Sequence, residues 1–267
     1  MPEHPAQSSD IEQVLPAGFK VAKWLGVGNF GKVCRAKGQG GFECAFKIIE
    51  MTRGKAVGIK EFRAFRMIRR IKPHRNLIDY LGVWLTTSDG TILDNADQIE
   101  DEDLQQLDVA ELLIQMPLAV KSLEVRLKEC RREFRAKTDR QPGDLPGIPL
   151  PELLPYMRGV AEALDHLHSP IHPLTDKGLG WIMHRDIKPA NILIDRTGNV
   201  VVADYGVARA VGTNVKSTQS GAGTPIYSAP EQITERVDVV DPASDQYSLA
   251  ITYYELRTGM LPFKDDV

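Results

Sequence analysis

The stretch WIMHRDIKPANILI, residues 181–194, limits the possible folds of this chain more than any other part of the sequence. Most of it is apolar, yet Asp186, Lys188 and Asn191 interrupt it at close quarters. A charged side chain is almost never buried without a partner, because an unpaired buried charge is very costly. The stretch therefore predicts a buried segment at which polar side chains meet partners from the rest of the fold or from a ligand.

Length and composition place the chain among soluble globular proteins. Its 267 residues are enough for one large domain or two lobes with a sizeable core. The formal net charge of −3 gives no general argument for a nucleic-acid or membrane partner. Three cysteines suit a reducing cytosol better than a disulfide scaffold, and the polar, acidic start lacks a signal-peptide pattern. No uncharged apolar run approaches the roughly 20 residues of a membrane helix, so we expect a cytoplasmic chain without a membrane segment.

The hydrophobic pattern predicts strands first and helices afterwards. Strands are expected within residues 19–50, over 77–85 and over 109–116, and helices over 60–71, from Leu123 onward, over 153–169 and over 241–259. The stretch PIHPLTDKGLGWIM, residues 170–183, is predicted to be a long loop. This order indicates an α+β protein with two lobes. We expect a loose segment over 1–18, a strand-rich lobe over 19–118 and a mainly helical lobe over 119–267.

A glycine-rich turn lies at the start of the strand-rich part. Gly26, Gly28 and Gly31 have the spacing G-x-G-x-x-G, which lets backbone N–H groups approach phosphate oxygens. A dinucleotide-binding unit has the same spacing, but a helix then opens at the glycines, whereas strand-like residues follow here. The stretch favours a hairpin that covers phosphates. Lys47, in the next apolar strand, is at a distance that could reach those phosphates, although alone it would be interpreted as a lysine on the solvent face of an edge strand.

With three later motifs, this part of the chain resembles the catalytic core of a protein kinase. The family pattern H-R-D-x-K-x-x-N, then D-F-G, then A-P-E is similar to HRDIKPAN at 184–191, DYG at 204–206 and APE at 229–231. With the glycine turn and Lys47, five motifs follow in the family's order over roughly residues 19–263. The resemblance is to eukaryotic-type Ser/Thr kinases. The inserted stretches of the sequence and the arginine-rich helix predicted from Leu123 onward look more like those of bacterial members than of animal ones.

The resemblance implies transfer of the γ-phosphate of ATP to Ser or Thr hydroxyls of proteins, with Mg²⁺ as cofactor. Asp186 would orient the hydroxyl and accept its proton, and Lys188 would steady the transferred phosphate. Asn191 and Asp204 would hold Mg²⁺ through the hard oxygen ligands that this ion demands. Lys47 would pair with the α- and β-phosphates. The other residues expected at the nucleotide are Gly26, Gly28, Gly31, Val33, Ala45, Met116, Ala119 and Leu193.

The resemblance also bears on the substrate and on regulation. Lys188 and Thr224 in GTPIYSAPE are typical of Ser/Thr kinases, and Glu231 argues for a protein substrate rather than a small molecule. In relatives that carry this arginine, Arg185 commonly receives a phosphate on the activation segment. Such a phosphate, added by the chain itself or by another kinase, would lie on one of four candidate acceptors, Thr213, Ser217, Thr218 and Ser220.

Three features depart from the family's pattern. Glu61, the carboxylate that would pair with Lys47, lies about one helical turn further from HRN than usual, so either the helix is a turn longer or the pair is absent. The chain stops after LRTGMLPFKDDV, where kinases continue through more helices, so we expect an incomplete second lobe. His166, His168 and His172 could suggest a metal site, but no cysteine or acidic spacing supports one. The alternative function is a pseudokinase or ATP-binding signalling module with little catalysis.

Overall fold

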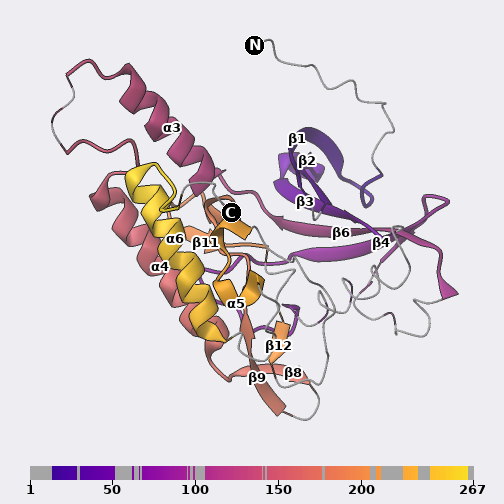
Figure 1. Ribbon diagram of the computed structural model, residues 1–267. Coiled ribbons are helices and arrows are strands. Elements are labelled where there is room, and N and C mark those ends of the chain that lie inside the picture. Colours follow the sequence, from indigo (N-terminus) through magenta and orange to yellow (C-terminus); the bar gives the residue numbers. More distant parts are fainter. Residues whose placement is uncertain are drawn as a thin grey trace. The chain divides into compact units, whose positions relative to one another are not determined.

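The chain divides into two compact units, Met1–Ile59 with Tyr80–Leu118 and Lys60–Asp79 with Ala119–Val267. A computed structural model describes residues 14–28, 31–51, 62, 66, 68–94, 96, 99, 106–139, 141, 143–175, 178–204, 209–211, 225–233 and 241–263. Strands make up the first unit, and helices with two small sheets make up the second, as Figure 1 shows by element labels. The predicted α+β class is confirmed.

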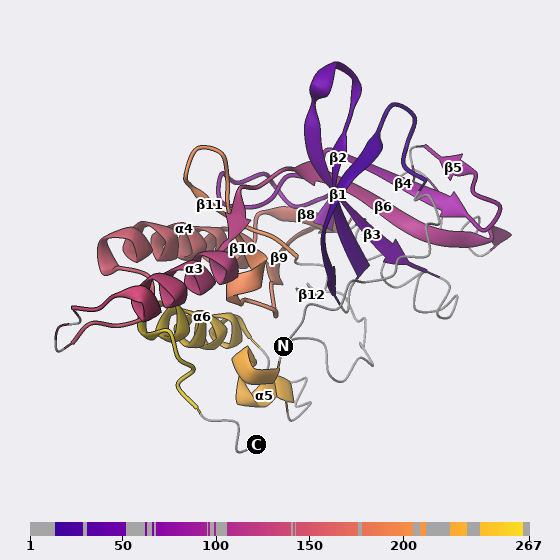
Figure 2. The ribbon, with the colours of Figure 1, turned by 90° about the horizontal axis from the view of Figure 1, so that it is seen from above.

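The first unit contains one antiparallel sheet of six strands in the order β1-β2-β3-β6-β4-β5. Figure 2 shows the hairpin of β1 and β2 at one side of this sheet. The strands are β1 Lys20–Gly28, β2 Gly31–Lys37, β3 Glu43–Glu50, β4 Gly82–Thr87, β5 Ile92–Leu93 and β6 Val109–Pro117, and the 3₁₀ helix η1 Gln39–Gly41 joins β2 to β3. Strands predicted within 19–50 and over 109–116 are confirmed. The strand predicted over 77–85 begins only at Gly82.

The core of the first unit lies on one face of this sheet. Alternate residues of β2 and β3 point to that face, because side chains of a strand alternate between its two sides. Phe46 is fully buried there and meets Phe19 edge-on, with ring centroids 5.2 Å apart. The buried cluster consists of Leu15, Cys34, Ala36, Cys44, Phe46, Ile48 and Leu113. Lys47 and its neighbours in register therefore face the other side.

Long helices dominate the second unit. They are α3 Leu123–Ala136, α4 Leu150–His168 and α6 Pro242–Thr258, with the short α5 Pro230–Ile233. Ser122 caps α3 by accepting a hydrogen bond from the Val125 amide, and α6 runs from a capping Asp241 to Gly259 in the left-handed conformation. The helices α4 and α6 pack against each other (Figure 1). On α4, Leu153, Val160, Leu164 and Leu167 are buried and Met157 is half-buried, at the spacing of one helix face.

Two three-stranded sheets complete the second unit, in the orders β11-β10-β7 and β12-β9-β8. Their strands are β7 Lys121–Ser122, β8 His172–Thr175, β9 Gly178–Met183, β10 Ile192–Ile194, β11 Val200–Val202 and β12 Arg209–Val211, and the 3₁₀ helices are η3 Pro189–Asn191 and η5 Pro225–Tyr227. The loop predicted over 170–183 is wrong, because β8 and β9 form an antiparallel hairpin there. Buried Leu174 and Ile182 pack with Ile71, which stabilises this hairpin despite its glycines and proline.

Residues 72–78, which follow the helix predicted over 60–71, belong to the second unit. Asn76 donates its side-chain amide to the Val200 carbonyl at 2.8 Å, and its own carbonyl accepts from the Val202 amide at 2.8 Å. The Ile78 amide donates back to the Val202 carbonyl at 3.0 Å. These bonds explain why the strand of the first unit begins later than predicted. In the part of the chain that the structure describes, no helix has both the length and the apolarity needed to cross a membrane.

Candidate functional site

The predicted site residues fall into two groups, one in each unit. In the first unit, the sheet register pairs Val33 with Lys47 and Lys47 with Ile114, and it pairs Ala45 with Met116. Directly opposed residues, and residues two apart along a strand, share a face of a sheet. Val33, Ala45, Lys47 and Met116 therefore lie together on the face opposite the core cluster.

Lys47 lies well inside the sheet and not at its edge. Its strand β3 runs between β2 and β6, and only 7% of the residue is exposed. The interpretation of Lys47 as a solvent-facing lysine on an edge strand is therefore wrong. Burying an ammonium group in this way is costly unless opposite charges or acceptors meet it. Such a lysine suits a role in binding anionic groups.

The glycine motif forms the hairpin that the sequence predicts. Gly28 pairs with Gly31 and Gly26 pairs with Val33, so a strand and not a helix follows the glycines. Gly31 has φ of +116°, and a Cβ added there would lie 2.1 Å from the carbonyl oxygen of Ile48. Only glycine fits at that position. The space beside Gly26 is open, with no atom within 4 Å of an added Cβ.

A second group surrounds Asp186, which is 4% exposed. Its Oδ2 accepts hydrogen bonds from Lys188 Nζ at 2.8 Å and from Asn191 Nδ2 at 2.9 Å. Asn191 Nδ2 also donates to the Asp186 carbonyl at 2.8 Å. The polar residues of the apolar stretch are thus one another's partners, and they converge on one carboxylate.

Two hydrogen bonds of the preceding residue, Ala203, place Asp204 next to this group. The Asn191 carbonyl accepts from the Ala203 amide at 2.9 Å, and the Ala203 carbonyl accepts from His184 Nε2 at 3.0 Å. Asp204 and Arg185 both have φ of +68°, which is unusual for residues with a side chain. Each such conformation costs on the order of 1–3 kcal/mol and is concentrated at functional sites. The loop is therefore held in a defined, strained shape.

Asp245 holds the backbone of the loop 184–191 in place. It was not singled out from the sequence. It is fully buried in α6, where its carboxylate accepts from the backbone amides of His184 and Arg185 and from His168 Nε2, each at 2.8 Å. Burial works against ionisation of Asp245, but the hydrogen bonds from His168 and from the two backbone amides hold its pKa below the ordinary value. Burial lowers the pKa of His184, which is neutral and bridges Asp186 N and the Ala203 carbonyl.

A sequence signal for this anchor exists in α6. Ser244, Ser248 and Thr252 recur every four residues and are all buried, so they mark a polar stripe on an inward face. Thr252 Oγ1 donates to the Ile187 carbonyl at 3.4 Å, and Ser244 Oγ donates to Glu231 at 2.6 Å. A buried polar stripe on a helix predicts backbone partners in the loop that packs on it.

The remaining predicted residues lie either in the second unit or outside the described residues. Leu193, half-buried in β10, pairs with Val201 and Ser122, and Ala119 lies half-buried in the second unit. Glu61, Tyr205, Thr224 and the four candidate phosphate acceptors, Thr213, Ser217, Thr218 and Ser220, lie outside the described residues. Predictions about them stay predictions.

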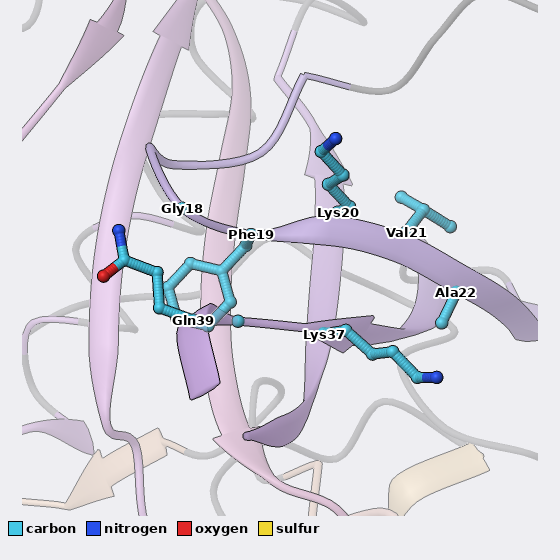
Figure 3. A pocket seen from close by; sticks show the side chains of 8 residues that line it. Gly18, Phe19, Lys20, Val21, Ala22, Lys37 and Gln39 are labelled. Atoms are coloured by element: carbon cyan, nitrogen blue, oxygen red, sulfur yellow. The ribbon is translucent and has the colours of Figure 1, made fainter. Parts of the chain in front are cut away.

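One hollow in the first unit does not involve the candidate residues. Its volume is about 530 Å³, and its lining comes from two short segments, residues 18–22 and 37–39. Figure 3 shows that the side chains of Lys20 and Lys37 point in different directions and do not converge. The hollow is therefore not a better candidate for the functional site.

Residues 19–267 match the profile of the protein kinase domain. The chain is 38% identical over 146 residues to serine/threonine-protein kinase PknB of Mycobacterium tuberculosis, a match to 48% of this chain and 23% of that protein. It is 37% identical over 142 residues to serine/threonine-protein kinase TIO of Arabidopsis thaliana, a match to 51% of this chain and 10% of that protein. It is also 37% identical over 132 residues to serine/threonine-protein kinase PknF of Mycobacterium tuberculosis, a match to 47% of this chain and 25% of that protein. The match spans a quarter or less of each of these relatives. Because the family profile covers nearly the whole sequence, the chain belongs to the protein kinase domain family.

Proposed function

We propose that this chain transfers the γ-phosphate of ATP to serine and threonine hydroxyls of protein substrates. Membership of the protein kinase domain family and similarity to three Ser/Thr protein kinases support this proposal. The observation that carries it is the convergence of Lys188 and Asn191 on the carboxylate of Asp186. Phosphoryl transfer asks a protein mainly for positioning and charge stabilisation, and this group supplies both.

In the proposed reaction, Asp186 orients the substrate hydroxyl and takes up its proton. Two donors on one oxygen fix the direction of the carboxylate, so that it need not reorganise when the hydroxyl arrives. Lys188 brings a positive charge to the same place and steadies the phosphate that is transferred. Because the loop is nearly buried, these charges act in a medium that screens them less than water does.

Asn191 and Asp204 are the proposed magnesium ligands, and their chemistry fits this ion. The amide nitrogen of Asn191 is engaged with Asp186, so its amide oxygen is the atom left to face a cation. Carboxylate and amide oxygens are the hard ligands that Mg²⁺ prefers, and the ion usually takes its other ligands from water and substrate phosphates. Among the described residues, no group of three or more His, Cys, Asp or Glu could form a dedicated metal cage. When bound, Mg²⁺ neutralises negative charge on the phosphates.

The face of the first unit's sheet is proposed to bind ATP. Lys47 would contact the α- and β-phosphates, and the backbone at Gly26, Gly28 and Gly31 would cover them. Val33, Ala45 and Met116 share the face of Lys47 and offer an apolar surface to adenine. Ala119 and Leu193 are also proposed to contact the adenine. The pairing of Glu61 with Lys47 and self-phosphorylation on Thr213, Ser217, Thr218 or Ser220 remain part of the proposal.

The test is incubation of the chain with radiolabelled γ-phosphate ATP, Mg²⁺ and a generic basic substrate protein. Asp186→Asn keeps the shape of the side chain but removes the base, so the initial rate should fall by about 10²–10⁴-fold. Asp204→Ala should abolish magnesium-dependent labelling. Asp165→Asn, at an exposed position of α4, is the matched control and should label at the wild-type rate.

Two outcomes would count against the proposal. Labelling by Asp186→Asn at the wild-type rate would remove Asp186 from its role. A wild-type chain that binds ATP but leaves serine and threonine unlabelled would instead support the alternative, an ATP-binding signalling module with little catalysis.

A further inference from the structure

Three histidines from three different elements of the second unit are in contact. The rings of His74 and His166 are stacked with centroids 4.8 Å apart, and those of His166 and His172 meet edge-on at 5.0 Å. His74 lies in the segment before Asn76, His166 in the last turn of α4 and His172 at the start of β8. Among the residues that the structure describes, none of the histidines belongs to a group able to hold a metal ion. His168, two residues after His166, instead forms a hydrogen bond with Asp245.

Two of these rings hold the peptide groups of Lys72. His166 Nε2 donates to the Lys72 carbonyl at 2.8 Å, and the Lys72 amide donates to His172 Nδ1 at 3.2 Å. His172 Nε2 faces the His166 carbonyl at 2.9 Å, so it must carry the proton, and Nδ1 must be bare to accept from Lys72. Fully buried His172 is therefore neutral.

The third ring holds the next part of the same segment. His74 Nδ1 accepts from the Asn76 amide at 3.2 Å, which again requires an unprotonated nitrogen. Asn76 is in turn bonded to Val200 and Val202 of β11. The segment 72–76 is thus held at one end by imidazoles and at the other by β11.

We propose that His74, His166 and His172 form a pH-sensitive clamp, which holds segment 72–76 on α4 and β8 while His74 and His172 are neutral. Protonation of Nδ1 on His172 would replace its acceptor lone pair with an N–H that faces the N–H of Lys72. The same replacement at His74 would face the Asn76 amide. Two charged rings about 5 Å apart would also repel each other. Acid therefore loosens the segment from both causes.

The charged groups around the clamp do not remove this effect. Burial, then His166 and Arg75, lower the pKa of His74, and Glu162 of α4 offsets them only in part. Burial, His166 and Lys72 likewise hold the pKa of His172 below the ordinary 6.5, although carbonyl hydrogen bonds oppose them. A base with a lowered pKa in the folded state binds fewer protons than in the unfolded chain. Its stabilising effect is therefore complete above pH 6.5 and is lost as the pH falls below that value.

The clamp lies in the same unit as residues 60–71, which contain Glu61. Under the proposed function, Glu61 is the partner of Lys47, so loosening of the segment that follows it in the sequence would lower kinase activity in acid. That consequence rests on the proposed function, whereas the clamp itself does not. Its test therefore uses no measurement of catalysis.

The experiment is an NMR titration of the full chain from pH 7.5 to 5.5. It follows the ring signals of the histidines and the hydrogen-exchange protection factor of the Lys72 amide. Because the pKa of His172 lies below its ordinary 6.5, the Lys72 protection factor should fall as the pH decreases. At pH 5.5, one unit below that ordinary value, the fall should reach up to about tenfold. The Leu81 amide, bonded to the Gln115 carbonyl in the first unit, is the internal reference and should not change.

The deciding variant is His172→Asn. Its side-chain oxygen can replace Nδ1 as the acceptor for Lys72, but it does not titrate. The fall in Lys72 protection should then be at most about a third of the wild-type fall. An equal fall in variant and wild type, or a wild-type His172 that titrates at its ordinary pKa with Lys72 protection unchanged, would overturn the clamp. If His172→Asn does not fold, His74→Asn decides by the same criterion, read at the Asn76 amide.

Discussion

Replacement of Asp245 by alanine tests how the backbone of the loop 184–191 is held. The change removes a buried carboxylate that accepts three hydrogen bonds, two of them from the amides of His184 and Arg185. A hydrogen bond to a charged group contributes about 1.5–3 kcal/mol, and such bonds are not additive when they share one acceptor. Removal of one partner from a buried charged network costs about 3–5 kcal/mol. We expect the free energy of unfolding of the second unit to fall by about 3–5 kcal/mol.

The assay is urea unfolding followed by hydrogen exchange of peptides from residues 181–204. Because exchange is measured per peptide, the second unit is observed separately from the first. Asp245→Asn retains one acceptor oxygen and should lose only about 1.5–3 kcal/mol. Asp165→Asn, exposed on α4, should change the unfolding free energy by less than about 0.5 kcal/mol. A loss below about 1 kcal/mol for Asp245→Ala would show that the loop holds its shape without this anchor.

The pH dependence gives this prediction a second check. The pKa of Asp245 is lowered in the folded state, so its stabilising effect is present above the ordinary value of 3.8 and is lost as the pH falls through the folded pKa. The difference in stability between wild type and Asp245→Asn should therefore be constant near neutral pH. It should shrink only below pH 3.8.

Two further substitutions test single contacts. Gly31→Ala combines a positive φ with a Cβ 2.1 Å from the Ile48 carbonyl, so urea unfolding should show a loss of about 2–5 kcal/mol in the first unit. Gly40→Ala, with positive φ but open space, should lose only about 1–2 kcal/mol, and equal losses would contradict the overlap. Tyr227→Phe removes a 2.7 Å hydrogen bond to Glu255 and should cost about 1–3 kcal/mol by urea unfolding, whereas an unchanged midpoint would show that the bond contributes nothing.

Much of the fold could be predicted because its signals are local. Alternating apolar residues and capping residues mark the strands and helices, and Asp241 and Gly259 cap α6 at the two ends of its predicted range. The convergence of Lys188 and Asn191 on Asp186 is also local, since all three lie within one short loop, although the sequence pattern predicts partners from the rest of the fold or from a ligand. A pattern over a few residues can specify such contacts.

What the sequence left open depends on distant contacts. The hairpin over 172–183 is composed of residues typical of loops, and it forms because Leu174 and Ile182 find Ile71, about 100 residues earlier. Asp245 follows the loop 184–191 by about 60 residues, and the polar stripe beside it in α6 does not show that its partner is His184. Periodicity gives the face on which a residue lies but not the partner that the fold brings to it.

The bonds between Asn76 and β11 also set an order of events during synthesis. Asn76 and Val200 are 124 residues apart. At about 5–20 residues per second, a ribosome needs roughly 6–25 s to produce the missing partner after Asn76 has been made. During this interval, the strands that precede residue 60 can pair, but the segment at 76–78 cannot complete its hydrogen bonds. A nascent chain stalled before residue 200 would therefore leave this segment open to chaperones and proteases.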